Sequence, residues 1–448
     1  MKRAAGLATT LSLLALLEGC ASHSERTAPV RSAMDLGNPA AAMALLNKEM
    51  GVQSDRDLPA DMGSDNALYV LDRGSIQQSV AKFDASKRDF EAADKAIDML
   101  DLAHDAKDTI GTYVFSGSSG KYQAAPYEKL LVNTLDMVNY LEQHDLDGAR
   151  VEARRLAVMQ KYVADDLHEA DNAVLGLGGF LAGFTFEESD KVDEALRWYD
   201  QALPFTGFHS LRDPVRRLLG KGQYRSPRLT ELEGEAAAAP APDDGSGEIV
   251  FVIGYGRVPH KIAHRVPIGL ALTMMSGALS PGDVAQANRL AAQGLVTWIN
   301  YPTLGPERGA YTIPACELDG HYVALEEAVN VTEQVRVEWK KIEGKIILSA
   351  VTRMISRFAA GSIAGAVAGQ KDGLIGTLVS LGTQATLTAL DTPDTRSWEM
   401  LPARVAIARV RVPAGHHTIH LAARGVSRDA AVEVEKDGWS VVSLMALR

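Results

Sequence analysis

The chain has 448 residues, 46 of them Lys or Arg and 57 Asp or Glu, and its formal net charge is −11. This length predicts two or three domains, and the acidic balance argues against a broad nucleic-acid interface, so no nucleic-acid partner is expected. Hydrophobic residues make up 46% of the chain, which is enough to bury a large core without help from disulfide bonds.

The N-terminus has the pattern of an export signal followed by a lipid attachment site. Lys2 and Arg3 precede a short apolar run that ends at Leu17, and a run this short is typical of a secretory signal rather than a membrane-spanning helix. The run closes on LEGC, which resembles the lipobox of bacterial lipoproteins, although its glutamate departs from that pattern. The resemblance implies a signal peptide over 1–19 and acylation of Cys20. An ordinary signal peptide with an incidental cysteine is the alternative.

The residue after Cys20 bears on which bacterial membrane would carry the lipid anchor. It is Ala21, and because an aspartate there is usual for inner-membrane retention, the lipobox resemblance implies a lipid anchor in the outer membrane, on its periplasmic face. Cys316 is then the one mature thiol, so no internal disulfide is expected. A lone cysteine of this kind is expected to be a small buried residue rather than a nucleophile.

Residues 20–38 are polar, contain Pro and Gly, and show no clear period, which predicts a tether between lipid and folded body. Residues 39–232 show apolar spacing of three and four, which predicts an all-α domain. Three of its segments resemble one another: SKRDFEAAD, ARVEARRLA and ALRWYDQAL. All three begin with a small residue, and two of them, SKRDFEAAD and ALRWYDQAL, place an aromatic residue four positions later and an alanine seven positions later. This pattern resembles the second helix of a tetratricopeptide (TPR) repeat, but the unequal spacing of the segments excludes a regular array. We therefore expect a TPR-like helical domain, with a generic helical bundle as the alternative.

Residues 233–247, EGEAAAAPAPDDGSG, offer no apolar face and predict an interdomain linker. Residues 248–448 then read as an antiparallel β domain. Its clearest strands are near the C-terminus, where apolar and charged residues alternate and where PAG and DG are turn signals. The expected fold class is therefore α+β and multidomain.

A long helical insertion is predicted within the β domain, at about 334–390. Gly361, Gly365 and Gly369 stand four residues apart, a spacing that permits close helix packing, including in membranes. Because Lys371 interrupts the apolar run, we favour a helical hairpin packed inside the protein. Membrane insertion or oligomerisation through the glycine face is the alternative.

The whole mature chain resembles a family of uncharacterised Gram-negative outer-membrane lipoproteins with a TPR-like first half. The resemblance rests on the stretches YEKLLVNTLDMVNYLEQHDLDGARVEARRL, GYGRVPHKIAHRVPIGLAL and DTRSWEMLPARVAIARVRVPAGHH. It implies a cell-envelope protein of unassigned role, and it supplies no catalytic residues.

The familiar catalytic motifs are absent from the sequence: it has no phosphate-binding loop, no Gly-x-Ser-x-Gly and no His-Glu-x-x-His. His260 and His264 would share one face of a helix, but no third ligand stands near them. In a strand, His416 and His420 would share a face while His417 points away. We therefore expect no catalytic residues, no metal and no cofactor.

Asp394, Arg396 and Trp398 are the remaining candidate site. They could form a recognition surface, with Arg for anions and Trp for stacking. The structural interpretation, which we favour, is an Asp–Arg pair and a Trp anchor where the insertion joins the last strands.

These features predict a non-enzymatic adaptor or scaffold. It would be anchored in the membrane by lipid and would bind periplasmic or outer-membrane proteins through the TPR-like domain. An envelope enzyme with an unfamiliar site in the β domain is one alternative. A membrane-active or export component that uses the glycine-spaced insertion is the other.

Overall fold

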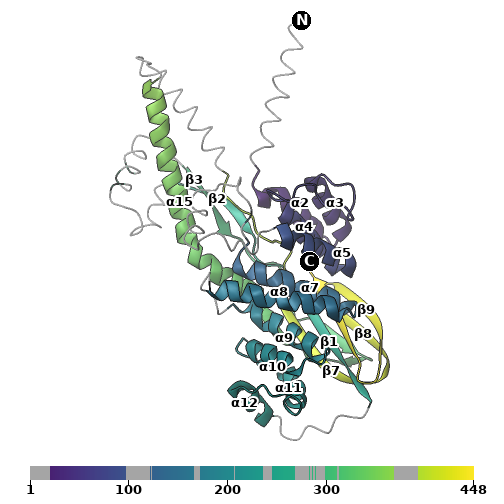
Figure 1. Ribbon diagram of the computed structural model, residues 1–448. Coiled ribbons are helices and arrows are strands. Elements are labelled where there is room, and N and C mark those ends of the chain that lie inside the picture. The colour runs from purple at the N-terminus through teal and green to yellow at the C-terminus, as the bar shows by residue number, and fades with distance from the viewer. Residues whose placement is uncertain are drawn as a thin grey trace.

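The computed structural model confirms an α+β protein, with helices in the first half of the chain and sheets in the second (Figure 1). It describes residues 21–96, 122, 124–165, 172–205, 207–235, 245–267, 282, 285, 288, 298–309, 312–367 and 392–448. Cys20 and the expected signal peptide lie outside these residues.

The first helices occupy most of the segment for which we predicted a tether. α2 (His23–Asp35) begins after Ser22, whose backbone N–H and hydroxyl both donate to the Glu25 carboxylate at 2.7 Å. α3 (Pro39–Met50) follows a short turn. Val30 and Met34 of α2 are buried in the main core. The tether predicted at 20–38 is therefore wrong for α2, because its few apolar side chains find partners far away in the sequence.

Three helical hairpins follow in the described part of the chain: α4 (Asn66–Ser79) with α5 (Phe83–Ala96), α7 (Pro126–Glu142) with α8 (Leu146–Asp165), and α9 (Val174–Glu187) with α10 (Val192–Ala202). The three similar sequence segments all belong to the second helices. In two hairpins a glycine of the first helix meets an aromatic ring of the second. A Cβ at Gly74 would lie 2.7 Å from the Phe90 ring, and one at Gly183 would lie 2.3 Å from the Tyr199 ring. These glycines allow the paired helices to approach closely.

Shorter helices lead from the hairpins to the first strand: the 3-10 helix η2 (His209–Leu211), α11 (Arg212–Leu219) and α12 (Pro227–Glu235). Val215 and Leu218 of α11 are buried in the main core, so this connection is part of the helical layer.

The described strands form two four-stranded sheets and a ribbon. The first sheet has the order β10 (Trp439–Ala446), β1 (Ser246–Tyr255), β7 (Arg404–Pro413), β6 (Glu326–Asn330). The second has the order β5 (His321–Tyr322), β4 (Ala315–Leu318), β8 (Gly415–Ala423), β9 (Val426–Val434). The ribbon pairs β2 (Lys261–Pro267) with β3 (Trp298–Leu304).

The expectation of an antiparallel domain needs correction. β8 and β9 form the expected antiparallel hairpin, but β7 and β10 belong to the other sheet, and β1 pairs with β10 in parallel. Parallel neighbours require a long connection, and here all the strands from β2 to β9 lie between them. Turn signals report only local hairpins, so they could not predict this pair.

The first sheet lies between the helices and the second sheet, and β1 is buried along its whole length. Val250 and Val252 face the helices, whereas Ile249, Phe251 and Ile253 face the second sheet. Burial on both faces explains why the sequence here is a continuous apolar run rather than an alternating one.

The helical and β halves share one core. The cluster of buried residues around the hairpins continues without a break into β1, β7 and β10. Residues 39–232 and 248–448 therefore form two layers that share one core, and their predicted division into separate domains stays a prediction. Of the predicted linker at 233–247, residues 236–244 lie outside the described residues.

The predicted insertion begins as one long helix, α15 (Val331–Val367). Gly361 and Gly365 fall within it, Gly369 lies outside the described residues, and the expected close packing of these glycines stays a prediction. Among the described residues, no helix is long and apolar enough to cross a membrane.

A cut in the predicted linker should leave the protein in one piece. Because the two halves share a core, fragments produced by cleavage between residues 236 and 244 should co-elute in gel filtration and separate only in denaturant. Fragments that separate in native buffer would contradict the shared core.

Candidate functional site

The crossover segment, residues 392–403, leads into β7 and is mostly buried without regular secondary structure. Buried backbone groups outside a helix or sheet need other partners, and here carboxylates supply them. The Trp398 N–H donates to Glu128 Oε1 at 2.8 Å, and the Met400 N–H donates to Asp72 Oδ1 at 2.9 Å. Acidic residues of α4 and α7 thereby hold the crossover segment inside the helical half.

The sequence-predicted residues of this segment have structural contacts. Arg396 donates to both carboxylate oxygens of Asp394, at 2.9 and 2.6 Å. Burial opposes ionisation of Asp394, but the guanidinium outweighs it and lowers the pKa of the carboxyl. Trp398 is fully buried, with its edge on Phe90 and its Nε1–H donating to Ser75 Oγ at 3.0 Å. A residue without exposed surface offers no stacking platform to a ligand.

A group that the sequence analysis did not identify lies beside this segment. We call it the buried triad: His23 of α2, Asp72 of α4 and Glu399 of the crossover segment. One ligand atom from each lies within 4.8 Å of the other two. The residues are 3%, 0% and 1% exposed, so the triad is closed to solvent.

Each residue of the triad has one polar atom held by a neighbour. His23 Nδ1 lies 2.9 Å from Asp65 Oδ2. Asp72 Oδ1 accepts the Met400 N–H, and Glu399 Oε2 accepts from Arg31 Nη1 at 2.5 Å. These contacts fix the orientation of all three side chains.

Among the described residues, the other polar atom of each has no hydrogen-bond partner: His23 Nε2, Asp72 Oδ2 and Glu399 Oε1. Leaving a buried polar atom unpaired costs about 1–3 kcal/mol. Burial, together with the negative charge of the Glu399 carboxylate, raises the pKa of Asp72 well above its ordinary value. The empty triad is therefore a costly arrangement.

Sequence reasoning missed the triad for a clear reason. Its members come from three segments far apart in the chain, and no spacing rule connects them. A weak signal did exist: Asp72 stands within the apolar stretch LYVLDRGSI, and Glu399 stands between Trp398 and Met400. An isolated acid in an apolar stretch often has a specific buried partner, but the sequence does not say which.

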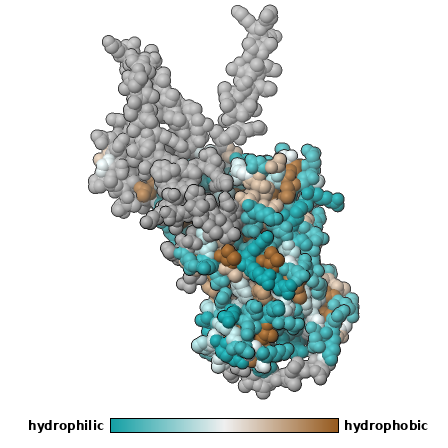
Figure 2. Space-filling view, in the orientation of Figure 1, coloured by the Kyte–Doolittle hydropathy of each residue, from teal (hydrophilic) through white to brown (hydrophobic). Residues whose placement is uncertain are grey.

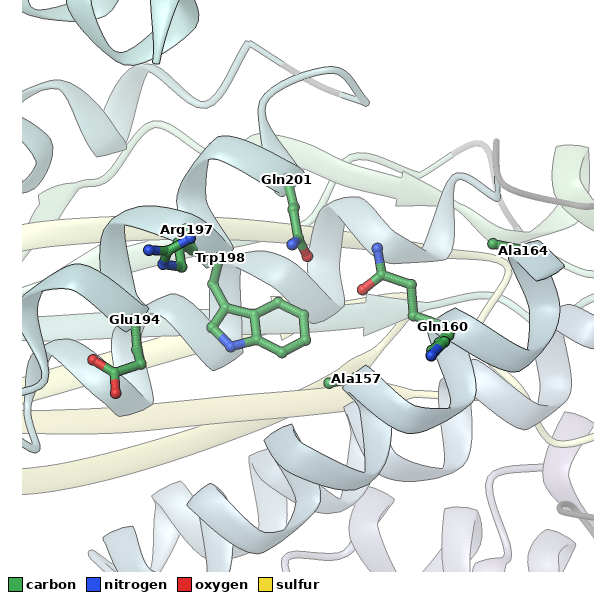
Figure 3. Close-up of a pocket in the computed structure, with 8 residues that line it drawn as sticks. Ala157, Gln160, Ala164, Glu194, Arg197, Trp198 and Gln201 are labelled. Carbon is green, nitrogen blue, oxygen red and sulfur yellow. The ribbon is translucent and has the colours of Figure 1, made fainter. Parts of the chain in front are cut away.

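A second feature is a groove of about 420 Å³ between α8 and α10. Its lining residues are Ala157, Gln160, Lys161, Ala164, Glu194, Arg197, Trp198 and Gln201. Figure 3 shows the side-chain amides of Gln160 and Gln201 directed into the space between the helices, beside the indole of Trp198. The groove thus combines an aromatic surface with amide donors and acceptors and charges of both signs.

The other candidate residues do not converge on either feature. Cys316 in β4 is fully buried, and burial raises the pKa of its thiol to about 12, so it is not an activated nucleophile. His264 lies in strand β2, so the helical interpretation of the His260–His264 pair is wrong. His417 is buried and bonded to Asp319, while His416 is exposed on the other face of β8.

Buried polar side chains also make contacts within and between the helices. Asn139 of α7 donates to Asp136 and to Ser86 of α5, both at 3.0 Å. Asn133 of α7 donates to Glu152 of α8 at 3.0 Å. Burial raises the pKa of Glu152 from 4.5 to about 7, although the positive charge of Arg155 acts in the opposite direction. These contacts join helices to one another and do not open on the groove.

A scan against protein-family models, a search of curated proteins and a search of solved structures each found no match.

The raised pKa of Glu152 predicts a pH effect on stability. The folded chain binds this proton more tightly than the unfolded chain does, so the free energy of unfolding should fall as the pH rises from about 4.5 to 7. A shift of this size corresponds to roughly 3 kcal/mol. Glu152→Gln should remove that part of the fall, as measured by denaturant unfolding at pH 4.5 and 8.

The control is Glu194→Gln, which changes an exposed glutamate of α10. It should keep the wild-type pH slope. An unchanged slope in Glu152→Gln would contradict the assignment.

Proposed function

We propose that this protein is a lipid-anchored, non-enzymatic scaffold at the periplasmic face of the outer membrane. It holds a protein of the cell envelope through the outer surface of its TPR-like hairpins. The observation that carries the proposal is the groove of about 420 Å³ that α8 and α10, two second helices, leave open to solvent.

The first helices of the hairpins are not available to a partner. Every residue of α9 from Val174 to Phe186 is buried, and so is α7 from Tyr127 to Leu141. They are covered by the first sheet, α15 and the neighbouring helices. A partner must therefore bind to the second helices. This binding mode differs from one in which a partner lies in a concave groove lined by the first helices.

The outer surface of α8 has the composition of a docking surface. Val151 and Val158 are 44% and 52% exposed and stand seven residues apart, so they share one helix face. Figure 2 shows hydrophobic side chains set among polar ones where α8 crosses the front of the molecule. Exposed apolar residues beside a groove with an aromatic floor favour protein binding.

The described hairpins also support the TPR-like interpretation. In α5 and α10 the small residue, the aromatic residue four positions later and the alanine seven positions later are all fully buried. They are Ser86, Phe90 and Ala93 in α5, and Ala195, Tyr199 and Ala202 in α10. The aromatic rings pack where a glycine of the first helix leaves room. This packing supports the proposed likeness to TPR hairpins.

The position of α2 suits a short anchor. α2 begins at His23, three residues after Cys20, and an extended chain spans at most about 3.6 Å per residue. An acyl chain on Cys20 would therefore lie within about 11 Å of the folded body. The scaffold would be held directly at the membrane surface rather than on a flexible tether.

The docking surface can be tested by photo-crosslinking in cells. A photo-reactive amino acid at Gln160 should form an adduct with an envelope protein. Val158→Asp should weaken that adduct about tenfold, because a buried valine side chain contributes roughly 1.5–3 kcal/mol and a charge there remains unpaired. The adduct is measured on gels and identified by mass spectrometry.

Val337→Asp is the matched control, since Val337 is 41% exposed on α15. It should leave the adduct unchanged. Equal loss in both variants, or no adduct from Gln160, would contradict docking on α8 and α10.

The anchor has its own test. Cys20→Ser should abolish incorporation of labelled palmitate and release the protein from membranes into the soluble fraction. Labelling that persists in Cys20→Ser would disprove acylation at this residue.

A further inference from the structure

We propose that the buried triad binds one divalent transition-metal cation, and that this cation fastens helix α2 to the rest of the protein. The proposal goes beyond the scaffold function and does not depend on it. It rests on the three free ligand atoms of His23, Asp72 and Glu399, which lie within 4.8 Å of one another.

The free atoms are all lone-pair acceptors when the carboxylates are ionised. His23 Nδ1 lies 2.9 Å from Asp65 Oδ2, and because a carboxylate oxygen accepts, Nδ1 is the donor. When the ring binds a cation, the lone pair that it offers is therefore on Nε2. A single water has only two hydrogens and would leave one of the three acceptors unpaired. One cation interacts with all three at once.

The surroundings of the triad resemble those of protein metal sites. Metal-binding histidines usually donate their other ring N–H to a carboxylate, and metal-binding carboxylates are themselves hydrogen-bonded. Here Asp65 orients His23, the Met400 N–H orients Asp72, and Arg31 orients Glu399. Each ligand is therefore held by a second contact.

Charge also favours a cation. The two carboxylates of the triad carry two negative charges when ionised, and Arg31 balances one of them. Arg26 is paired with Asp65, so its charge does not balance the carboxylates of the triad. When Asp72 is ionised, the closed site therefore holds a negative charge that a bound cation could balance.

The ligand types indicate the ion. Ca²⁺ and Mg²⁺ prefer oxygen ligands, whereas one imidazole with two carboxylates suits Zn²⁺ or a similar transition metal. Zinc lies about 2.0–2.2 Å from such ligands, so tetrahedral geometry would place them about 3.4 Å apart. The free atoms lie within 4.8 Å of one another, so they would have to come within about 3.4 Å of one another to surround a zinc ion.

The site has a structural rather than a catalytic character. Its three residues are at most 3% exposed, and catalytic metal sites keep a position open to substrate. The ligands belong to α2, α4 and the crossover segment. An ion would thus join the helix next to the expected acylation site to both halves of the protein.

Calorimetric titration of the full chain tests the proposal. The protein is purified in detergent without a histidine tag, stripped with a chelator, and titrated with Zn²⁺. We expect one Zn²⁺ per chain, a higher melting temperature with Zn²⁺, and no competition from equimolar Mg²⁺. Absence of saturable one-to-one uptake by the wild-type chain would overturn the site, and equal binding of Mg²⁺ would overturn the assignment to a transition metal.

Variants locate the ion. His23→Gln and Glu399→Gln should lose Zn²⁺ binding, and the second keeps an oxygen that can accept from Arg31, so its fold should persist by circular dichroism. Asp65→Asn, which changes a positioning residue, should weaken binding about 10–100-fold. Binding by His23→Gln equal to that of the wild type would place the ion elsewhere and refute the proposal.

His417→Gln is the matched control. His417 is also a buried histidine hydrogen-bonded to a carboxylate, that of Asp319 at 2.7 Å, but it lies on β8 and is not part of the triad. It should bind Zn²⁺ as the wild type does. Loss of binding in His417→Gln with retention in His23→Gln would indicate a β8 site and exclude the triad.

Hydrogen exchange tests the fastening. Zn²⁺ should slow amide exchange in α2 of the wild type and leave it unchanged in Glu399→Gln. Stoichiometric Zn²⁺ binding without slower exchange in α2 would refute the role in fastening.

Discussion

The rest of the structure depends on the burial of the crossover segment inside the helical half. A segment without helix or strand carries backbone groups that must find partners within the protein. Asp72 and Glu128 accept the Met400 and Trp398 N–H groups, and Trp398 fills the space between α4 and α5 against Ser75 and Phe90. Asp72 and Glu128 are therefore needed as buried acids because they accept the backbone N–H groups of the crossover segment.

This arrangement explains why the two halves share one core. The crossover segment enters the helical half immediately before β7, and β7 lies beside β1 at the centre of the first sheet. The helices then cover one face of that sheet, and the second sheet covers the other. Because the first helices of the described hairpins cover the sheet, the second helices of these hairpins are the ones that face solvent.

The same constraint creates the buried triad. α2 reaches the crossover segment through the Ser24 N–H, which donates to Thr395 Oγ1 at 3.0 Å, and through Arg31, which pairs with Glu399. These contacts bring His23 next to Asp72, an acid already buried to hold Met400. A scaffold partner on α8 and α10 and a cation in the triad would therefore act at separate places, one on the outer surface and one within the core.

The sequence by itself determined the α+β layout, with helices in the first half and strands in the second, because this follows from local apolar periodicity and turn residues. It also indicated the importance of the stretch from Asp394 to Trp398. Only the tertiary structure decided that α2 docks, that β1 pairs with β10 in parallel and that the halves share a core. Those features, like the meeting of His23, Asp72 and Glu399, depend on contacts between residues far apart in the chain, and local patterns contain no information about which distant partner each residue meets.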